Sequence, residues 1–165
     1  MIEINERFDV SCAAPRDVWK LLSDPHAVVE CVPGAALGDE HEDGSFDGTL
    51  AVRFGPAKVT FRARIELALD DDKMTGSVTA RGKDSQGGSR FRATMAFRVA
   101  GQAGHAGQGG STVIIDGENE ITGKLAGIVE AGARIVVKRM AAEFAENLAA
   151  RCGGAQIKDK PQAAE

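Results

Sequence analysis

Apolar and polar residues alternate along most of the middle of the chain, a period of two that is typical of strands with one buried face. In residues 58–69, Val59 and Phe61 fall on one face and Arg62 falls on the other. The same alternation predicts strands over residues 2–12, 50–55, 90–99 and 111–121, and a weaker strand over 74–82. Glycine-rich or acidic turns separate these segments, so a meandering antiparallel sheet is the simplest arrangement.

Helical spacing replaces this alternation in three places. Residues 14–22 predict a short helix that follows the first strand, and a second short helix is expected over residues 24–32. The last apolar pattern predicts a helix from about Lys124 to Arg151, on the order of 40 Å long at 1.5 Å per residue. After it, residues 153–165 are polar and contain glycine and proline, which is typical of a flexible tail.

This order of elements predicts an α+β fold in a single domain over residues 1–152. We expect a curved antiparallel sheet of about six or seven strands that wraps around the long C-terminal helix, with two short helices after the first strand. Such a sheet encloses more volume than one helix fills. The remaining space is therefore either packed core or a cavity.

Charge and cysteine content narrow the functional classes. The formal net charge of −4 disfavours broad nucleic-acid binding, which depends on many phosphate contacts. The three cysteines are odd in number and lack CxxC spacing, which favours reduced thiols over a disulfide framework or a zinc site. The N-terminus lacks the apolar core of a signal peptide, and no apolar run is long enough to span a bilayer. We therefore expect a cytoplasmic protein.

Four segments carry a resemblance to a known family. They are CVPGA at 31–35, VRFGPAKVTFRARIEL at 52–67, GKDSQGG at 82–88 and GKLAGIVEAGARIV at 123–136. With the tryptophan helix after the first strand, they make the chain resemble the CoxG family of carbon monoxide dehydrogenase proteins, within the START-like (SRPBCC) superfamily. The resemblance covers residues 1 to about 150 and implies a helix-grip fold.

The resemblance also implies a function. Family members are associated with molybdenum-containing hydroxylases of the carbon monoxide dehydrogenase type, with proposed roles in maturation, membrane recruitment and carriage of a lipophilic quinone. We therefore expect a non-catalytic protein that binds a lipophilic ligand, a quinone or another isoprenoid lipid, in an elongated cavity. Its protein partner would be such a molybdenum hydroxylase. Peripheral contact with the inner face of the membrane is a further expectation.

The apolar sheet face and the long helix supply the candidate ligand contacts, because ligand sites are typically apolar clefts with few polar groups. The predicted ligand-binding residues are Phe54, Phe61, Ile65, Phe91, Met95, Phe97, Val113, Ile115, Leu125, Ile128 and Gly132. Gly127 and Gly132 weaken the first half of the helix and remove side chains there, which predicts a deformable lid. The alternative is ordinary close packing of helix against strand. Thr60, Thr94 or a backbone N–H is expected to donate to the ligand.

The opposite sheet face is rich in arginine, with acidic residues among the cations. Arg53, Arg62, Arg64, Arg90 and Arg92 form the predicted partner surface, either for an acidic protein or for anionic lipid. The simpler interpretation is a solvated face of weak cross-strand ion pairs. An adaptor of the hydroxylase that acts through this face, with an incidental cavity, is the main alternative function.

Catalytic and metal-binding motifs are not predicted. His26, His41 and His105 lack metal-ligand spacing, and the glycine-rich segment 100–111 lacks the lysine of a phosphate loop. A cyclase- or dehydratase-like enzyme, the third hypothesis, needs a titratable pair inside the cavity. Acidic strand residues fall mostly on the charged face, and Glu6, which shares the parity of Ile4 and Phe8, is an exception.

Overall fold

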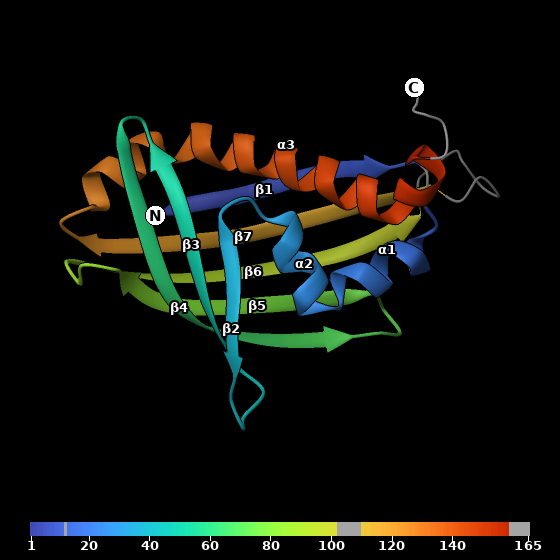
Figure 1. Ribbon diagram of the computed structural model, residues 1–165, viewed down its shortest axis with the longest axis horizontal. Helices are drawn as coiled ribbons and strands as arrows, with labels where there is room; N and C mark the ends of the chain where they lie inside the picture. Colours follow the sequence, from blue (N-terminus) through green and yellow to red (C-terminus); the bar gives the residue numbers. More distant parts are fainter. Residues whose placement is uncertain (12, 102–109, 159–165) are drawn as a thin grey trace.

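The computed structural model describes residues 1–11, 13–101 and 110–158, which form a seven-stranded antiparallel sheet and three helices (Figure 1). The strands are ordered β1-β7-β6-β5-β4-β3-β2. Their bounds are β1 (Ile2–Val10), β2 (Ala35–Glu40), β3 (Phe46–Phe54), β4 (Ala57–Asp70), β5 (Thr75–Asp84), β6 (Ser89–Gly101) and β7 (Ser111–Gly123). This arrangement confirms the curved sheet that the alternation predicts.

The helices are α1 (Pro15–Leu22), α2 (Pro25–Cys31) and α3 (Ala126–Lys158). Each short helix begins with a proline in its first turn, and the Asp24 side chain accepts a hydrogen bond from the His26 N–H, 3.0 Å away, at the start of α2. Figure 1 shows α3 running across the open side of the curved sheet, with α1 and α2 beside its C-terminal half. The helix packs against β1 and β7 on one side and against β3 on the other.

Alternation decides which face of each strand is covered. Along β6 the odd-numbered residues from Phe91 to Val99 are buried or half-buried, whereas Arg90, Arg92 and the other even-numbered residues up to Arg98 are exposed. Each strand turns its apolar side toward α3, and so the sheet has an inner face toward the helices and an outer face toward solvent.

Most of the buried apolar side chains form two separate cores rather than one. The first, which we call the α1-side core, consists of Val10, Ala13, Val18, Trp19, Leu22, Cys31, Val99, Val113 and Leu148. The second, the β3-side core, consists of Val52, Phe54, Val59, Phe61, Ile121, Val129 and Val136. The two cores lie at opposite ends of α3 and of the strands beneath it. Packing therefore holds the helix firmly at both ends.

The start of α3 depends on one backbone geometry and one side-chain cap. Gly123 has a φ of +102°, and an added Cβ there would collide with the carbonyl oxygen of Gly88. The Ser89 hydroxyl accepts a hydrogen bond from the Leu125 N–H at 2.7 Å. Gly123 thus ends β7 and precedes the helix. At the other end α3 continues to Lys158.

Gly127 has an environment that favours a larger residue. An added Cβ at Gly127 would meet no atom within 4 Å, and its φ lies outside the left-handed region. We expect Gly127→Ala to raise the free energy of unfolding by roughly 0.5–1 kcal/mol, because alanine loses less backbone entropy in a helix. Urea denaturation monitored by circular dichroism measures the change.

Gly123→Ala is the matched control for this prediction, since it places the same methyl group in a left-handed conformation against Gly88. This variant should lose stability. A stabilised Gly123→Ala, or a destabilised Gly127→Ala, would contradict the assigned start of the helix.

Candidate functional site

Between the two cores, the inner face carries two cross-strand rows that are less well buried. The register aligns Ile2, Asn119, Ala93, Ala80 and Ile65 in one row and Ile4, Gly117, Met95, Val78 and Leu67 in the next. All ten residues are half-buried although they face the helix side. We call these two rows the inner-face band.

Small side chains lie at the centre of this band. Ala80 and Ala93 pair directly across β5 and β6, whereas the flanking inward positions of β6 include Phe91 and Phe97, which pack against opposite cores. On α3, Gly132 is likewise small. Since α3 packs against β1, β7 and β3, the middle strands form the far wall beneath it. The band is therefore a mainly apolar part of the inner face that neither core buries.

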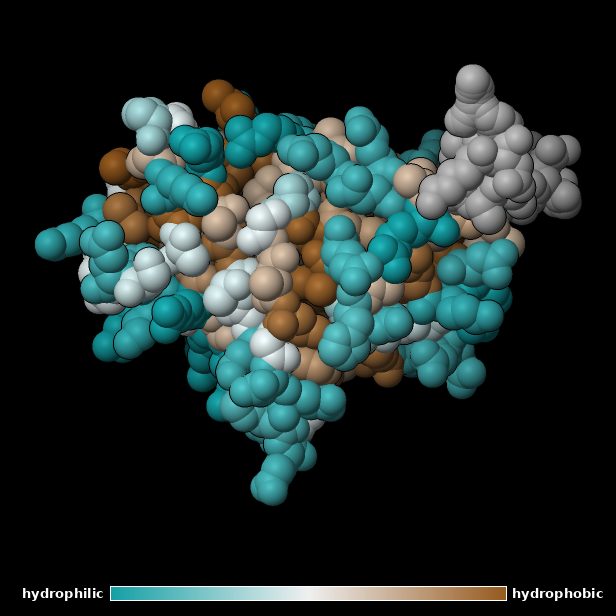
Figure 2. All heavy atoms as spheres, viewed as in Figure 1, coloured by the Kyte–Doolittle hydropathy of each residue, from teal (hydrophilic) through white to brown (hydrophobic). Residues whose placement is uncertain are grey.

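The helix side of the molecule has apolar side chains at its surface. Figure 2 shows them gathered near the start of α3 and again in the centre of the view, between α3 and α2, with hydrophilic side chains around both groups. Two large apolar side chains in the first half of α3 are exposed, Ile128 at 46% and Ile135 at 73%. The first half of α3 therefore presents apolar side chains to solvent as well as to the β3-side core.

Two polar groups face inward beside the apolar residues. Asn119 lies in the band opposite Ala93, and its side chain makes no hydrogen bond with the residues that the structure describes. Glu6 follows Ile4 on β1, with a side chain that is 14% exposed, and its Oε2 lies 3.1 Å from Nζ of Lys138 on α3. Asn119 offers both a donor and an acceptor to anything that occupies the band.

The predicted ligand-binding residues divide between the band and the cores. Ile65 and Met95 lie in the band. The others on the sheet pack into the two cores or against them, and Phe61 and Phe91 make an edge-to-face contact with centroids 5.2 Å apart. These core residues are Phe54, Phe61, Phe91, Phe97, Val113 and Ile115.

The predicted helix contacts are only partly placed on the inner side. Leu125 packs against the β3-side core, and a Cβ added at Gly132 would lie 3.4 Å from Phe54 Cδ1. Gly127 is exposed and faces open space, and Ile128 is not enclosed. The expectation that Gly127 makes room for a ligand stays a prediction, since the space beside it is open. Gly127 and Ile128 lie away from the stripe of α3 that faces the sheet.

Thr60 and Thr94 do not point toward the inner-face band. Strand parity places both on the outer face, and Thr94 is exposed. The inward polar residue that sequence reasoning missed is Asn119. Asn119 is an odd-numbered residue of β7, as are the inward Ile115 and Ile121, and this spacing could have identified it. The acidic residues between the two isoleucines made the stretch look like part of the charged face.

The predicted partner-surface arginines all project outward and are exposed. Two hollows of about 490 Å³ and 460 Å³ also open on this outer face, and their walls come mainly from outward residues of β1 and β4–β7. They therefore lie on the opposite side of the sheet from the inner-face band.

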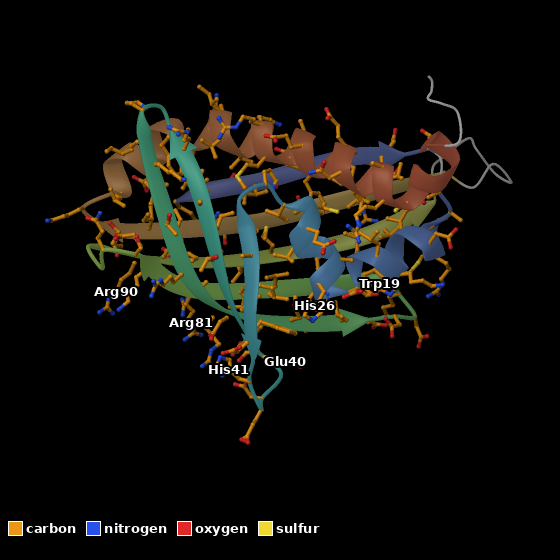
Figure 3. The ribbon with its side chains drawn as sticks, viewed as in Figure 1. Trp19, His26, Glu40, His41, Arg81 and Arg90 are labelled. Carbon is orange, nitrogen blue, oxygen red and sulfur yellow. The ribbon has the colours of Figure 1, made fainter. Side chains whose placement is uncertain are left out.

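Among the described residues, titratable groups do not gather on the inner side, and no three or more potential metal ligands form a cluster. Nε2 of His41 lies 2.8 Å from Oδ1 of Asp47 at the exposed end of the β2–β3 hairpin, near Glu40 (Figure 3). The hydrogen bond from His41, with the nearby charge of Arg64, lowers the pKa of Asp47. Cys12 and His105 lie outside the described residues.

Among the helices that the structure describes, none combines the length and the apolar character that crossing a bilayer requires.

Solved structures with this fold include enzymes and proteins of other kinds. A conserved protein from Geobacillus kaustophilus matches with a TM-score of 0.77 at 17% identity, covering 93% of this chain and 97% of the other. The Zhui aromatase/cyclase from Streptomyces sp. R1128 matches with a TM-score of 0.64 at 13% identity, covering 96% and 98%. Norcoclaurine synthase from Thalictrum flavum matches with a TM-score of 0.55 at 15% identity, covering 90% and 84%. These likenesses confirm the helix-grip fold.

The family assignment comes from a different comparison. No curated protein matches the chain. The family profile for CoxG, a subunit of carbon monoxide dehydrogenase, matches residues 7–153, from β1 through most of α3. This range includes both cores and most of the inner-face band. The chain therefore belongs to the CoxG family of carbon monoxide dehydrogenase proteins.

Proposed function

We propose that the chain is a non-catalytic carrier that holds a lipophilic ligand, an isoprenoid quinone, against the inner-face band and serves a molybdenum hydroxylase of the carbon monoxide dehydrogenase type. The observation that carries this proposal is the half-buried apolar band between two packed cores. A protein that used this space only for stability would gain by filling it, since each additional buried CH₂ contributes about 0.8 kcal/mol.

Both parts of a quinone, its isoprenoid tail and its ring, suit the residues of this band. Its isoprenoid tail is insoluble in water and gains free energy from any dry apolar wall, such as the one formed by Ile4, Ile65 and Val78. Its ring carries carbonyl oxygens that accept hydrogen bonds. The side-chain amide of Asn119, inward and without a partner among the described residues, supplies a donor to one of them.

An adaptor that acts through its outer face is the second candidate, because the exposed arginines of β4 and β6 favour it. The two candidate functions place different requirements on the inner-face band. A carrier requires a vacant band, whereas an adaptor functions equally well with the band filled by side chains. Substitutions that fill the band therefore discriminate between them.

Ala93→Leu is the variant that fills the band. We expect it to weaken the binding of decylubiquinone at least tenfold, measured by fluorescence quenching of Trp19 or by calorimetry, while the melting temperature stays unchanged or rises. A leucine that enters vacant space buries apolar area, whereas a leucine forced into a packed core costs about 1–3 kcal/mol.

Ala96→Leu is the matched control, because Ala96 lies three residues further along β6 on the exposed outer face. It should leave decylubiquinone binding within twofold of the native protein. A large loss of stability in Ala93→Leu would show that the interior is packed, and unchanged binding in a folded Ala93→Leu would remove the band as the ligand site.

Asn119→Leu tests the proposed hydrogen bond to the ring. One neutral hydrogen bond contributes about 1 kcal/mol, so decylubiquinone should bind roughly fivefold more weakly. Decylbenzene, which has an apolar tail and a ring without carbonyls, should bind as it does to the native protein. The exposed Asn5→Leu on β1 is the control. Equal effects on both ligands would place the ring elsewhere.

A further inference from the structure

Six cations on the outer face form a regular two-by-three grid. The register places Arg62, Lys83 and Arg90 side by side across β4, β5 and β6, and it places Arg64, Arg81 and Arg92 in the next row. All six side chains are exposed. Figure 3 shows Arg81 and Arg90 projecting from the sheet on the side away from α3. We call this set the basic grid.

The grid is dense. Neighbouring strands lie about 4.8 Å apart, and successive outward residues on one strand lie about 6.8 Å apart. Six positive charges therefore arise from a patch of backbone of about 10 by 7 Å. Arg53 and Lys58, which pair directly across β3 and β4, extend the positive surface beyond this patch.

Folding does not account for the grid. Like charges directly opposite each other on adjacent strands are destabilising, and the grid contains four such pairs: Arg62 with Lys83, Lys83 with Arg90, Arg64 with Arg81, and Arg81 with Arg92. The acidic side chains that offset this repulsion lie only at the edges of the grid. Arg64 Nη1 lies 3.9 Å from Asp43 and its Nε lies 3.7 Å from Asp47, and Arg92 pairs across the strands with Glu120. Arg81, at the centre of its row, has a cation on each side.

The same outer face is acidic further along the strands. Glu3 pairs with Glu118, and Asp116 pairs with Asn5 in the following row. These residues line the hollow of about 490 Å³, whose remaining outward side chains are small: Ser77, Thr79, Thr94 and Ala96. The hollow begins one outward row beyond Arg81 and Arg92, and so about 7 Å from them. The outer face therefore places a positive patch beside a negative hollow.

This division favours a protein over a lipid bilayer as the occupant. An anionic membrane presents a uniform negative surface, which attracts the grid but repels Glu3, Asp116 and Glu118 beside it, on a chain of net charge −4. A folded protein can match both signs at a fixed spacing. Arginine also favours bidentate pairing with carboxylates, and five of the six cations of the grid are arginines.

We propose that the basic grid docks an acidic protein surface, a cluster of Asp and Glu side chains, whose neighbouring Lys or Arg side chain enters the hollow lined by Glu3, Asp116 and Glu118. The identity of the partner as the carbon monoxide dehydrogenase-type hydroxylase rests on the proposed function. The docking surface itself includes Arg81 and Lys83, which join the five arginines predicted from sequence. This geometry leaves the inner face free during docking.

The test is the affinity of the full chain for the hydroxylase purified from the same cells, measured by calorimetry at 50 mM and 300 mM NaCl. The triple variant Arg62→Glu, Arg81→Glu, Arg90→Glu should bind at least tenfold more weakly at 50 mM NaCl. Its melting temperature should be unchanged or higher, because each new glutamate lies opposite a remaining cation or relieves a like-charge pair. Higher salt should weaken binding of the native chain and have little effect on the variant.

The control variant Lys20→Glu, Lys73→Glu, Arg134→Glu makes the same change of net charge at exposed positions on α1, α3 and a turn. It should bind within threefold of the native chain. A third variant, Glu3→Gln, Asp116→Asn, Glu118→Gln, should weaken binding severalfold, because it removes the charge of the hollow. Vesicles that contain 30% phosphatidylglycerol serve as the membrane probe for all variants.

Three results would overturn the proposal: native affinity in the grid variant, no binding between the native chain and the hydroxylase, or a loss in the grid variant that appears with vesicles and not with the hydroxylase. Decylubiquinone binding is measured on the same preparations. Retained quinone binding without hydroxylase binding would overturn the docking surface and leave the carrier intact. A native chain that does not bind the quinone would instead contradict the proposed function.

Discussion

One helix is too narrow to cover the inner face of a seven-stranded sheet, and the rest of the structure depends on this constraint. The strands span six intervals of about 4.8 Å, or roughly 29 Å if flat, whereas a helix with its side chains is about 10 Å wide. The sheet responds by curving, so that α3 meets β1 and β7 on one side and β3 on the other. On the strands between them, the inner-face band belongs to neither core.

The two cores follow from this geometry. At one end α1 and α2 complete the covering, and Leu148 and Val18 become fully buried. At the other end the β3–β4 hairpin folds over, so that Phe54 and Phe61 pack against Val136. Neither the two short helices nor the β3–β4 hairpin covers the middle of the sheet. The half-burial of the inner-face band thus follows from where covering elements are available, and small residues such as Ala80 and Ala93 lie at its centre.

Sequence pattern predicted the sheet, the helices and the face of nearly every strand residue, because each strand is half-buried and parity is then a strong signal. It did not predict β2, since Gly38, Asp39 and Glu40 leave that strand with little apolar alternation. It also favoured large residues such as Phe54 and Val113 as ligand contacts, although large residues are the ones that complete a core. The sequence also did not predict the full basic grid. Arg81 lies directly across the strands from Arg64 and Arg92, and this depends on the strand register, which the pattern within a single strand does not reveal.

The most direct test of the account is a methyl-resolved NMR titration of the protein with decylubiquinone. The account predicts large shifts for methyl groups of the inner-face band, Ile4, Ile65, Val78 and Leu67, while Leu148 in the α1-side core and Ile114 on the outer face remain unchanged. Shifts confined to Ile114 and its neighbours, or none anywhere at saturating quinone, would contradict it.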